Sequence, residues 1–82
     1  MNKLEFEMQD EKIRKSIAEH IDNYLKVNNI SNLEFAKRFS IDEKAVRKWR
    51  NAESYPSHKY LPTICDMLKI TLDELFGRIK KD

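Results

Sequence analysis

Glycine, proline and cysteine are all scarce in this chain of 82 residues, which has one glycine, two prolines and one cysteine. A β-rich domain usually needs more glycine at its turns, so this scarcity favours an all-helical fold. The single Cys65 cannot form an intrachain disulfide and is typical of a reducing compartment. With Gly77 as its one glycine, the chain has no glycine-rich loop to hold a phosphate group.

Long apolar runs and catalytic motifs are missing as well. Hydrophobic residues make up 40% of the chain, but no run approaches the roughly 18 residues that a membrane-spanning helix needs. The N-terminus, MNKLEFEMQDEK, lacks the apolar centre of a signal peptide, so a cytoplasmic protein is expected. No nucleophile motif stands out, and neither His20 nor His58 has other ligands at metal-binding spacing. We therefore expect that the protein is not an enzyme and has neither a cofactor nor a metal site.

Positive charge is unevenly distributed, although the net charge is only +2. Residues 31–60 hold seven basic and four acidic side chains, whereas residues 1–30 hold five basic and six acidic ones. Residues 61–82 hold four of each. A local basic surface is typical of nucleic-acid binding, but a solvated helix face explains the charge alone equally well.

Hydrophobic spacing predicts a first helix from Glu11 to Val27. Its apolar residues Ile13, Ile17 and Ile21 recur every four positions and lie on one face. The preceding segment KLEFEMQ differs, because its apolar residues alternate with polar ones, a pattern that predicts a strand in need of a partner. A frayed tail or an extension of the first helix fits this segment equally well.

Capping signals mark four further helices. Ser31 and Glu34 have the spacing of a capping box and begin a second helix that ends near Phe39. Asp42 caps a third helix, residues 43–51. Pro62 fits only the first turn of a helix, so a fourth begins near residue 59 or 60. A second capping box at residues 71–74 opens a short fifth helix, which Gly77 ends.

The second and third helices are separated by the short break Ser40-Ile41-Asp42. Two helices that cross at a wide angle need a small residue at the crossing, and Ala36 supplies it opposite Val46. This is the layout of a helix-turn-helix. The residues predicted to face inward are Phe35, Ala36, Phe39, Ile41, Val46 and Trp49. Cys65 is predicted to lie in the core as well.

The order of these features resembles the Cro/repressor type of helix-turn-helix domain, found in phage repressors and many small bacterial regulators. The resemblance implies an all-α, five-helix domain over residues 11–76, with an N-terminal extension (residues 1–10) and a C-terminal tail (residues 77–82). Four positions depart from the family pattern: Ser40 replaces a usual glycine, Arg50 and Ala52 replace the outer residues of Glu-Asn-Gly, and Asn32 replaces a common glutamine. Here Asn51 is predicted to take the left-handed conformation that ends the third helix. The match consists of Ala36, the turn around Ser40-Ile41, Val46, Trp49, Asn51, Pro56, Tyr60-Leu61-Pro62, Ile64, Leu68 and Ile70 to Leu75.

The resemblance implies a sequence-specific binder of double-stranded DNA, a small transcriptional regulator that reads the major groove with the helix of residues 43–51. It also implies a homodimer on two half-sites and leaves room for a regulatory protein partner. Glu43 has a second interpretation, because an acidic residue also stabilises a helix N-terminus. The implied base contacts are Glu43, Lys44, Arg47 and Lys48. The implied phosphate contacts are Asn32, the backbone around Asp42, Arg50, His58 and Lys59.

A protein-interaction module is the alternative function. In that case the same fold serves as an antitoxin, antirepressor or adaptor, and the third helix meets protein instead of DNA. The low net charge and Glu43 keep this alternative open. Two segments are candidate dimer surfaces, the alternating N-terminus and residues 76–79.

Overall fold

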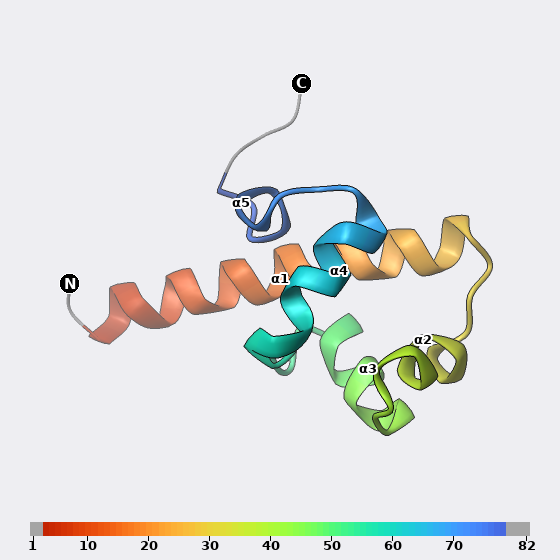
Figure 1. The fold of residues 1–82 in the computed structure, drawn as a ribbon. Helices are drawn as coiled ribbons and strands as arrows, with labels where there is room; N and C mark the ends of the chain where they lie inside the picture. The colour runs from red at the N-terminus through yellow and green to blue at the C-terminus, as the bar shows by residue number, and fades with distance from the viewer. Residues whose placement is uncertain (1–2, 79–82) are drawn as a thin grey trace.

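The computed structural model describes residues 3–78, and every regular element in that range is helical. Figure 1 shows α1 running the length of the molecule, with the other helices gathered along the part of α1 that follows its N-terminal end. The prediction of an all-α domain with five α-helices is confirmed over the described residues. The elements are α1 (Lys3–Val27), α2 (Asn32–Phe39), α3 (Glu43–Arg50), the 3-10 helix η1 (His58–Tyr60), α4 (Leu61–Leu68) and α5 (Leu72–Leu75).

The core draws on all five α-helices. Burial of these apolar side chains is the main force that holds such short helices together, because each is marginal in isolation. Four of the six predicted inward residues of the central pair are buried, and Phe39 and Ile41 are half-buried against the core. The buried cluster consists of Ile17, Ile21, Leu25, Phe35, Ala36, Val46, Trp49, Ile64, Cys65 and Leu75.

All five α-helices end just before a residue with a left-handed backbone. After α2, the amide of Ile41 donates to the carbonyl of Ala36 and the amide of Ser40 donates to that of Lys37, both at 3.2 Å. This pair of bonds is the Schellman motif, which usually uses glycine because other residues are strained there by about 1 kcal/mol. The five left-handed residues are Asn29, Ser40, Ala52, Lys69 and Gly77.

The end of α3 differs from the prediction. Asn51 does not adopt the left-handed conformation, so that prediction is wrong. Asn51 has φ −93° and its amide donates to the carbonyl of Arg47 at 3.0 Å, so it continues the helical hydrogen bonding. The left-handed residue is Ala52, with φ 59°. The chain therefore reverses one residue later than predicted, at the position where the family pattern has glycine.

Gly77 is required by a close approach as well as by its φ of 75°. A Cβ atom at this position would lie 2.7 Å from the Ser16 hydroxyl, which itself donates to the carbonyl of Leu75 at 2.9 Å. The prediction that Gly77 ends the fifth helix is confirmed. The contact fixes the end of α5 against α1.

The predicted N-terminal strand is wrong, and its alternative, an extension of the first helix, is confirmed from Lys3 onward. Adding turns to an existing helix avoids the cost of nucleation, and the segment is rich in Glu, Lys, Leu and Met, which favour helix. Ion pairs between Asp10 and Arg14 (3.0 Å) and between Glu11 and Lys15 (3.1 Å) add to it. No boundary in secondary structure separates residues 3–10 from the rest of α1.

Most of the expected C-terminal tail, residues 79–82, lies outside the described residues, as does the final residue of the candidate dimer segment 76–79. Between residues 3 and 78, none of the helices combines the length and the apolar character needed to cross a bilayer.

Candidate nucleic-acid interface

Helix α3 is held by its N-terminal cap and by its buried face. The Asp42 carboxylate accepts from the amide of Lys44 at 2.8 Å, as the sequence predicts. Val46 and Trp49 point into the core, where they are 0% and 4% exposed. Burial of Trp49 supports its predicted role in the core and removes it as a platform for stacking bases.

Aromatic rings fill the space beneath α3. Phe35 and Phe39 of α2 contact Trp49 edge-on, with ring centroids 6.5 and 6.2 Å apart. Tyr60 of η1 adds a ring 5.3 Å from Phe39 and 6.2 Å from Trp49. Edge-to-face pairs of this kind fix orientation as well as burying area. The packing therefore sets the position of α3 relative to both α2 and η1.

The outer face of α3 is basic. Lys44, Arg47 and Lys48 are all exposed on it, as predicted for side chains that face a groove. Glu43 is half-buried and accepts two hydrogen bonds from Arg47, at 3.2 and 2.7 Å to the same carboxylate oxygen. These bonds and the charge of Glu43 raise the pKa of Arg47. Glu43 therefore holds the Arg47 side chain along the helix.

Arg50 points inward, although the sequence assigned it to phosphate. Its Nε donates to Asp22 Oδ1 at 2.9 Å, a second nitrogen bonds the same oxygen, and Nη1 donates to Asn32 Oδ1 at 2.7 Å. The hydrogen bond from Arg50, followed by one from Lys26, lowers the pKa of Asp22. One guanidinium thus joins the end of α3 to α1 and to the start of α2.

The loop after α3 is fastened to α1 by a second polar cluster. Arg14 donates to the carbonyl of Ala52 at 2.6 Å, and the Tyr55 hydroxyl donates to the Asp10 carboxylate at 2.6 Å. Burial, then the bond to Asp10, raises the pKa of Tyr55 to about 12. The bond from Tyr55, and more weakly Arg14, lowers the pKa of Asp10. Local spacing could not predict the bonds between Arg14 and Ala52 or between Tyr55 and Asp10, because these partners are 38 and 45 positions apart.

The remaining predicted phosphate contacts lie at helix starts. Asn32 is half-buried at the beginning of α2, beside the Ser31–Glu34 capping box, whose serine accepts from the Glu34 amide at 3.1 Å. His58 and Lys59 are exposed in η1, where the Lys59 ammonium sits 5.2 Å from the Tyr60 ring centroid. Contact between Tyr60 and the α2–α3 rings places η1 beside the helix-turn-helix.

A model of the Cro/C1-type helix-turn-helix DNA-binding domain matches residues 20–81. The chain belongs to this Cro/C1-type family. It is similar to the cryptic phage CTXphi transcriptional repressor RstR of Vibrio cholerae serotype O1, with 32% identity over 66 residues, 80% of this chain and 59% of the relative. The chain thus spans about three-fifths of the length of that curated relative. No solved structure matches the sequence.

Cys65, which the sequence placed in the core, is buried on α4, and burial raises the pKa of its thiol. A raised pKa keeps the thiol protonated and disfavours reaction through the thiolate. Within the described part of the chain, no three His, Cys, Asp or Glu side chains are grouped to hold a metal ion.

Proposed function

We propose that this Cro/C1-type domain is a sequence-specific regulator that reads the major groove of double-stranded DNA with α3. The observation that carries the proposal is the two-sided α3, with Val46 and Trp49 locked in the core and Lys44, Arg47 and Lys48 exposed on one basic face. Similarity to a phage transcriptional repressor supports the regulatory part of the proposal.

Base contacts are proposed for Lys44, Arg47 and Lys48, whose donors suit guanine O6 and N7. Glu43 has two compatible roles: it orients Arg47 in the free protein, and its carboxylate is a suitable acceptor for cytosine N4. A base that draws Arg47 away from Glu43 frees that carboxylate. The pair is therefore proposed to act as one reading unit.

Phosphate contacts are proposed for Asn32, the backbone at Asp42, His58 and Lys59. Because Asn32 Oδ1 accepts from Arg50, its amide nitrogen is left as the donor, which is the group that a phosphate oxygen requires. We therefore propose that Arg50 acts by positioning Asn32 and does not itself contact a phosphate. The Asp42 carboxylate is already used as a cap, so only its neighbouring backbone amides suit an anion.

A homodimer is part of the proposal, since one small domain offers few phosphate contacts. Two copies double them and read half-sites about 34 Å apart, one turn of DNA. Doubling the contacts also steepens the dependence of affinity on salt.

Selection from a random duplex library at about 0.15 M salt tests the function, because this salt suppresses purely electrostatic binding. We expect enrichment of an inverted repeat. Arg47→Ala and Lys48→Ala should lose preference for that site, whereas Lys59→Ala should weaken all duplexes alike. Absence of enrichment would contradict the proposal and would favour the protein-interaction module.

A further inference from the structure

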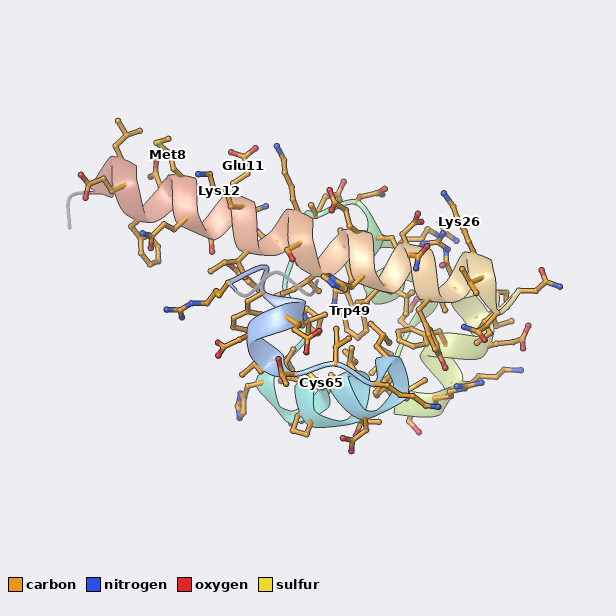
Figure 2. The ribbon with its side chains drawn as sticks, turned by 90° about the horizontal axis from the view of Figure 1, so that it is seen from above. Met8, Glu11, Lys12, Lys26, Trp49 and Cys65 are labelled. Atoms are coloured by element: carbon orange, nitrogen blue, oxygen red, sulfur yellow. The ribbon has the colours of Figure 1, made fainter. Side chains whose placement is uncertain are left out.

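The N-terminal end of α1 exposes apolar side chains on two opposite faces. Leu4, Phe6 and Met8 are 65%, 62% and 52% exposed. At about 100° per residue, Leu4 and Met8 share one face of the helix and Phe6 lies on the other. Figure 2 shows Met8 pointing away from α4 and α5, so Phe6 lies on the side of α1 that faces the body of the domain.

Phe6 continues the stripe through which α1 contributes to the core. Ile13 follows Phe6 by seven residues, about two turns, and Ile17 follows by four more. Ile17 is 1% exposed and Ile13 is half-buried against the core. The N-terminal end of α1, the part that carries Phe6, extends beyond the gathered helices (Figure 1). The core stripe of α1 therefore runs out onto the surface and ends at Phe6.

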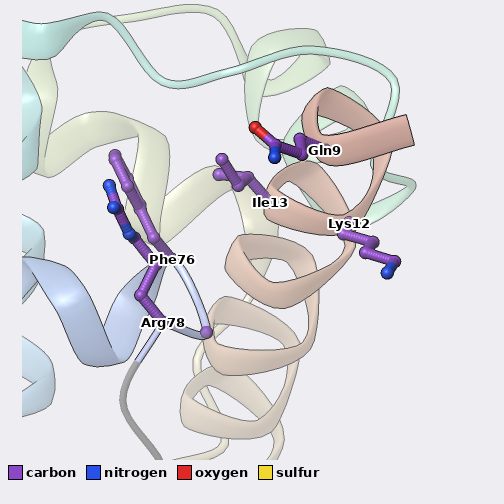
Figure 3. A pocket seen from close by; sticks show the side chains of 6 residues that line it. Gln9, Lys12, Ile13, Phe76 and Arg78 are labelled. Atoms are coloured by element: carbon purple, nitrogen blue, oxygen red, sulfur yellow. The ribbon is translucent and has the colours of Figure 1, made fainter. Parts of the chain in front are cut away.

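A hollow of about 300 Å³ lies beside this stripe, between α1 and the chain that follows α5. Figure 3 shows Gln9 and Ile13 pointing from α1 toward the side on which Phe76 and Arg78 lie. The floor is apolar, because Ile13 and Phe76 are both half-buried, and the exposed Arg78 adds a basic group beside it. The Lys12 side chain points away from Phe76 and Arg78 (Figure 3).

We propose that this surface binds a second copy of the chain, with Phe6 of each protomer entering the hollow of the other. The proposal rests on the homodimer proposed above and assigns its interface. Phe6 and Ile13 are about 10 Å apart along α1. A two-fold axis midway between them, near Gln9, brings each Phe6 against the Ile13–Phe76 floor of the partner, so one patch serves both sides.

Charge favours this occupant over DNA. The end of α1, from Lys3 to Glu11, carries four acidic side chains and a single basic one, so it repels phosphate. The same acidic segment complements Arg78, which lines the hollow of the other copy. The α1 part of this surface, within residues 3–19, lies outside the family match at 20–81, whereas Phe76 and Arg78 lie inside it.

Sedimentation equilibrium of the full chain without DNA, from about 1 to 500 µM, tests the interface. A surface this small lies at the low end of specific interfaces, so a dissociation constant in the micromolar range is expected. Phe6→Ala should raise it about tenfold or more, as loss of a central aromatic anchor does. Met8→Ala, a matched truncation on the opposite face of the same turns, should change it less than about twofold. Thermal unfolding of both variants by circular dichroism checks that the monomers stay folded.

A charge pair completes the test. Arg78→Glu should weaken the dimer, whereas Lys15→Glu makes the same change in net charge on the Met8 side of α1 and should not. A wild-type monomer at every concentration would overturn the proposal, and so would equal effects of Phe6→Ala and Met8→Ala. Since DNA is absent, a dimer that binds no duplex would refute the DNA-binding function alone, and a DNA-binding monomer would refute the interface alone.

Discussion

The outer face of α3 and the N-terminal end of α1 both project side chains into solvent. The two surfaces differ in charge and in how closely the rest of the domain packs against them. Basic residues cover α3, and packed aromatic rings lie directly beneath it. The end of α1 is acidic and apolar, and it extends past the other helices (Figure 1). Charge suits one surface to phosphate and the other to protein. The aromatic rings packed beneath α3 hold the helix in a fixed position, and the proposed contacts with DNA bases need such fixed geometry. An apolar contact between proteins depends less on it.

The largest expected effect contrasts two phenylalanines. Phe35 is 0% exposed beneath α3, so Phe35→Ala should lower the free energy of unfolding by about 3–5 kcal/mol. Phe6 is 62% exposed, so Phe6→Ala should change it by less than about 0.5 kcal/mol in the monomer. Urea denaturation at a protein concentration well below the dissociation constant expected for the dimer measures both. Similar losses in the two variants would show that the end of α1 is packed after all.

The next effect concerns DNA affinity. Arg47→Ala should cost about 1–3 kcal/mol at the preferred duplex and little at a scrambled one, because we propose that Arg47 contacts a base. Fluorescence anisotropy with a single half-site duplex measures this without a contribution from dimerisation. Lys15→Ala removes one positive charge from α1 and serves as the control. If Lys15→Ala reproduced the whole loss, net charge and not the α3 face would govern binding.

The third comparison is between Arg50, which joins α3 to α1 and α2, and Arg47, which lies on the exposed face of α3. Arg50→Ala should lower the free energy of unfolding by about 1–2 kcal/mol, because it removes charge-assisted bonds to Asp22 and Asn32. Arg47→Ala, which removes bonds within an exposed turn, should cost about 0.5 kcal/mol or less. Thermal denaturation resolves the difference, at about 4–8 °C per kcal/mol for a domain of this size. An equal cost for the two arginines would contradict the assigned roles.

The same ion pair predicts a dependence of stability on pH. Arg50 lowers the pKa of Asp22 from its ordinary 3.8, so the folded state favours the charged carboxylate. The stabilisation is present above pH 3.8 and is lost as the pH falls through the lowered pKa of the folded state. Asp22→Asn should flatten stability in this acid range. Unfolding curves of both proteins between about pH 2 and pH 5 test this, and Glu19→Gln, on the same helix, is the control.

The smallest effect is a gain. Ser40 has φ 55°, so Ser40→Gly should relieve strain and raise the free energy of unfolding by up to about 1 kcal/mol. Ser57 has φ −58°, so Ser57→Gly should only add freedom to the unfolded chain and be neutral or destabilising. A loss of stability in Ser40→Gly would mean that the Ser40 side chain contributes more than its backbone strain costs.

Local signals predicted the helix starts well. The capping boxes at Ser31–Glu34 and Thr71–Glu74 and the cap at Asp42 form as expected, because each depends on residues within three positions of one another. Local signals failed where two local states were close in energy. Residues 3–10 alternate like a strand, but continuity with a long helix decided their state.

Polar contacts between residues far apart in the chain could not be predicted from the sequence. The basic side chains of residues 44–50 all appeared equally able to face DNA, yet Arg50 is bound to Asp22, 28 residues away. The exposed faces of Lys44, Arg47 and Lys48 followed from helix period alone. Their separation from Arg50 did not, because it depends on how α3 crosses α1.

By itself the sequence determined the helical fold class, the break between α2 and α3, and the basic face of α3, since periodicity, caps and charge act within a few residues. Only the tertiary structure decided which arginine is held inside, which residue reverses the chain after α3, and which apolar side chains of α1 stay uncovered. These outcomes depend on where distant segments meet, and the free energy of those contacts is absent until the chain has packed.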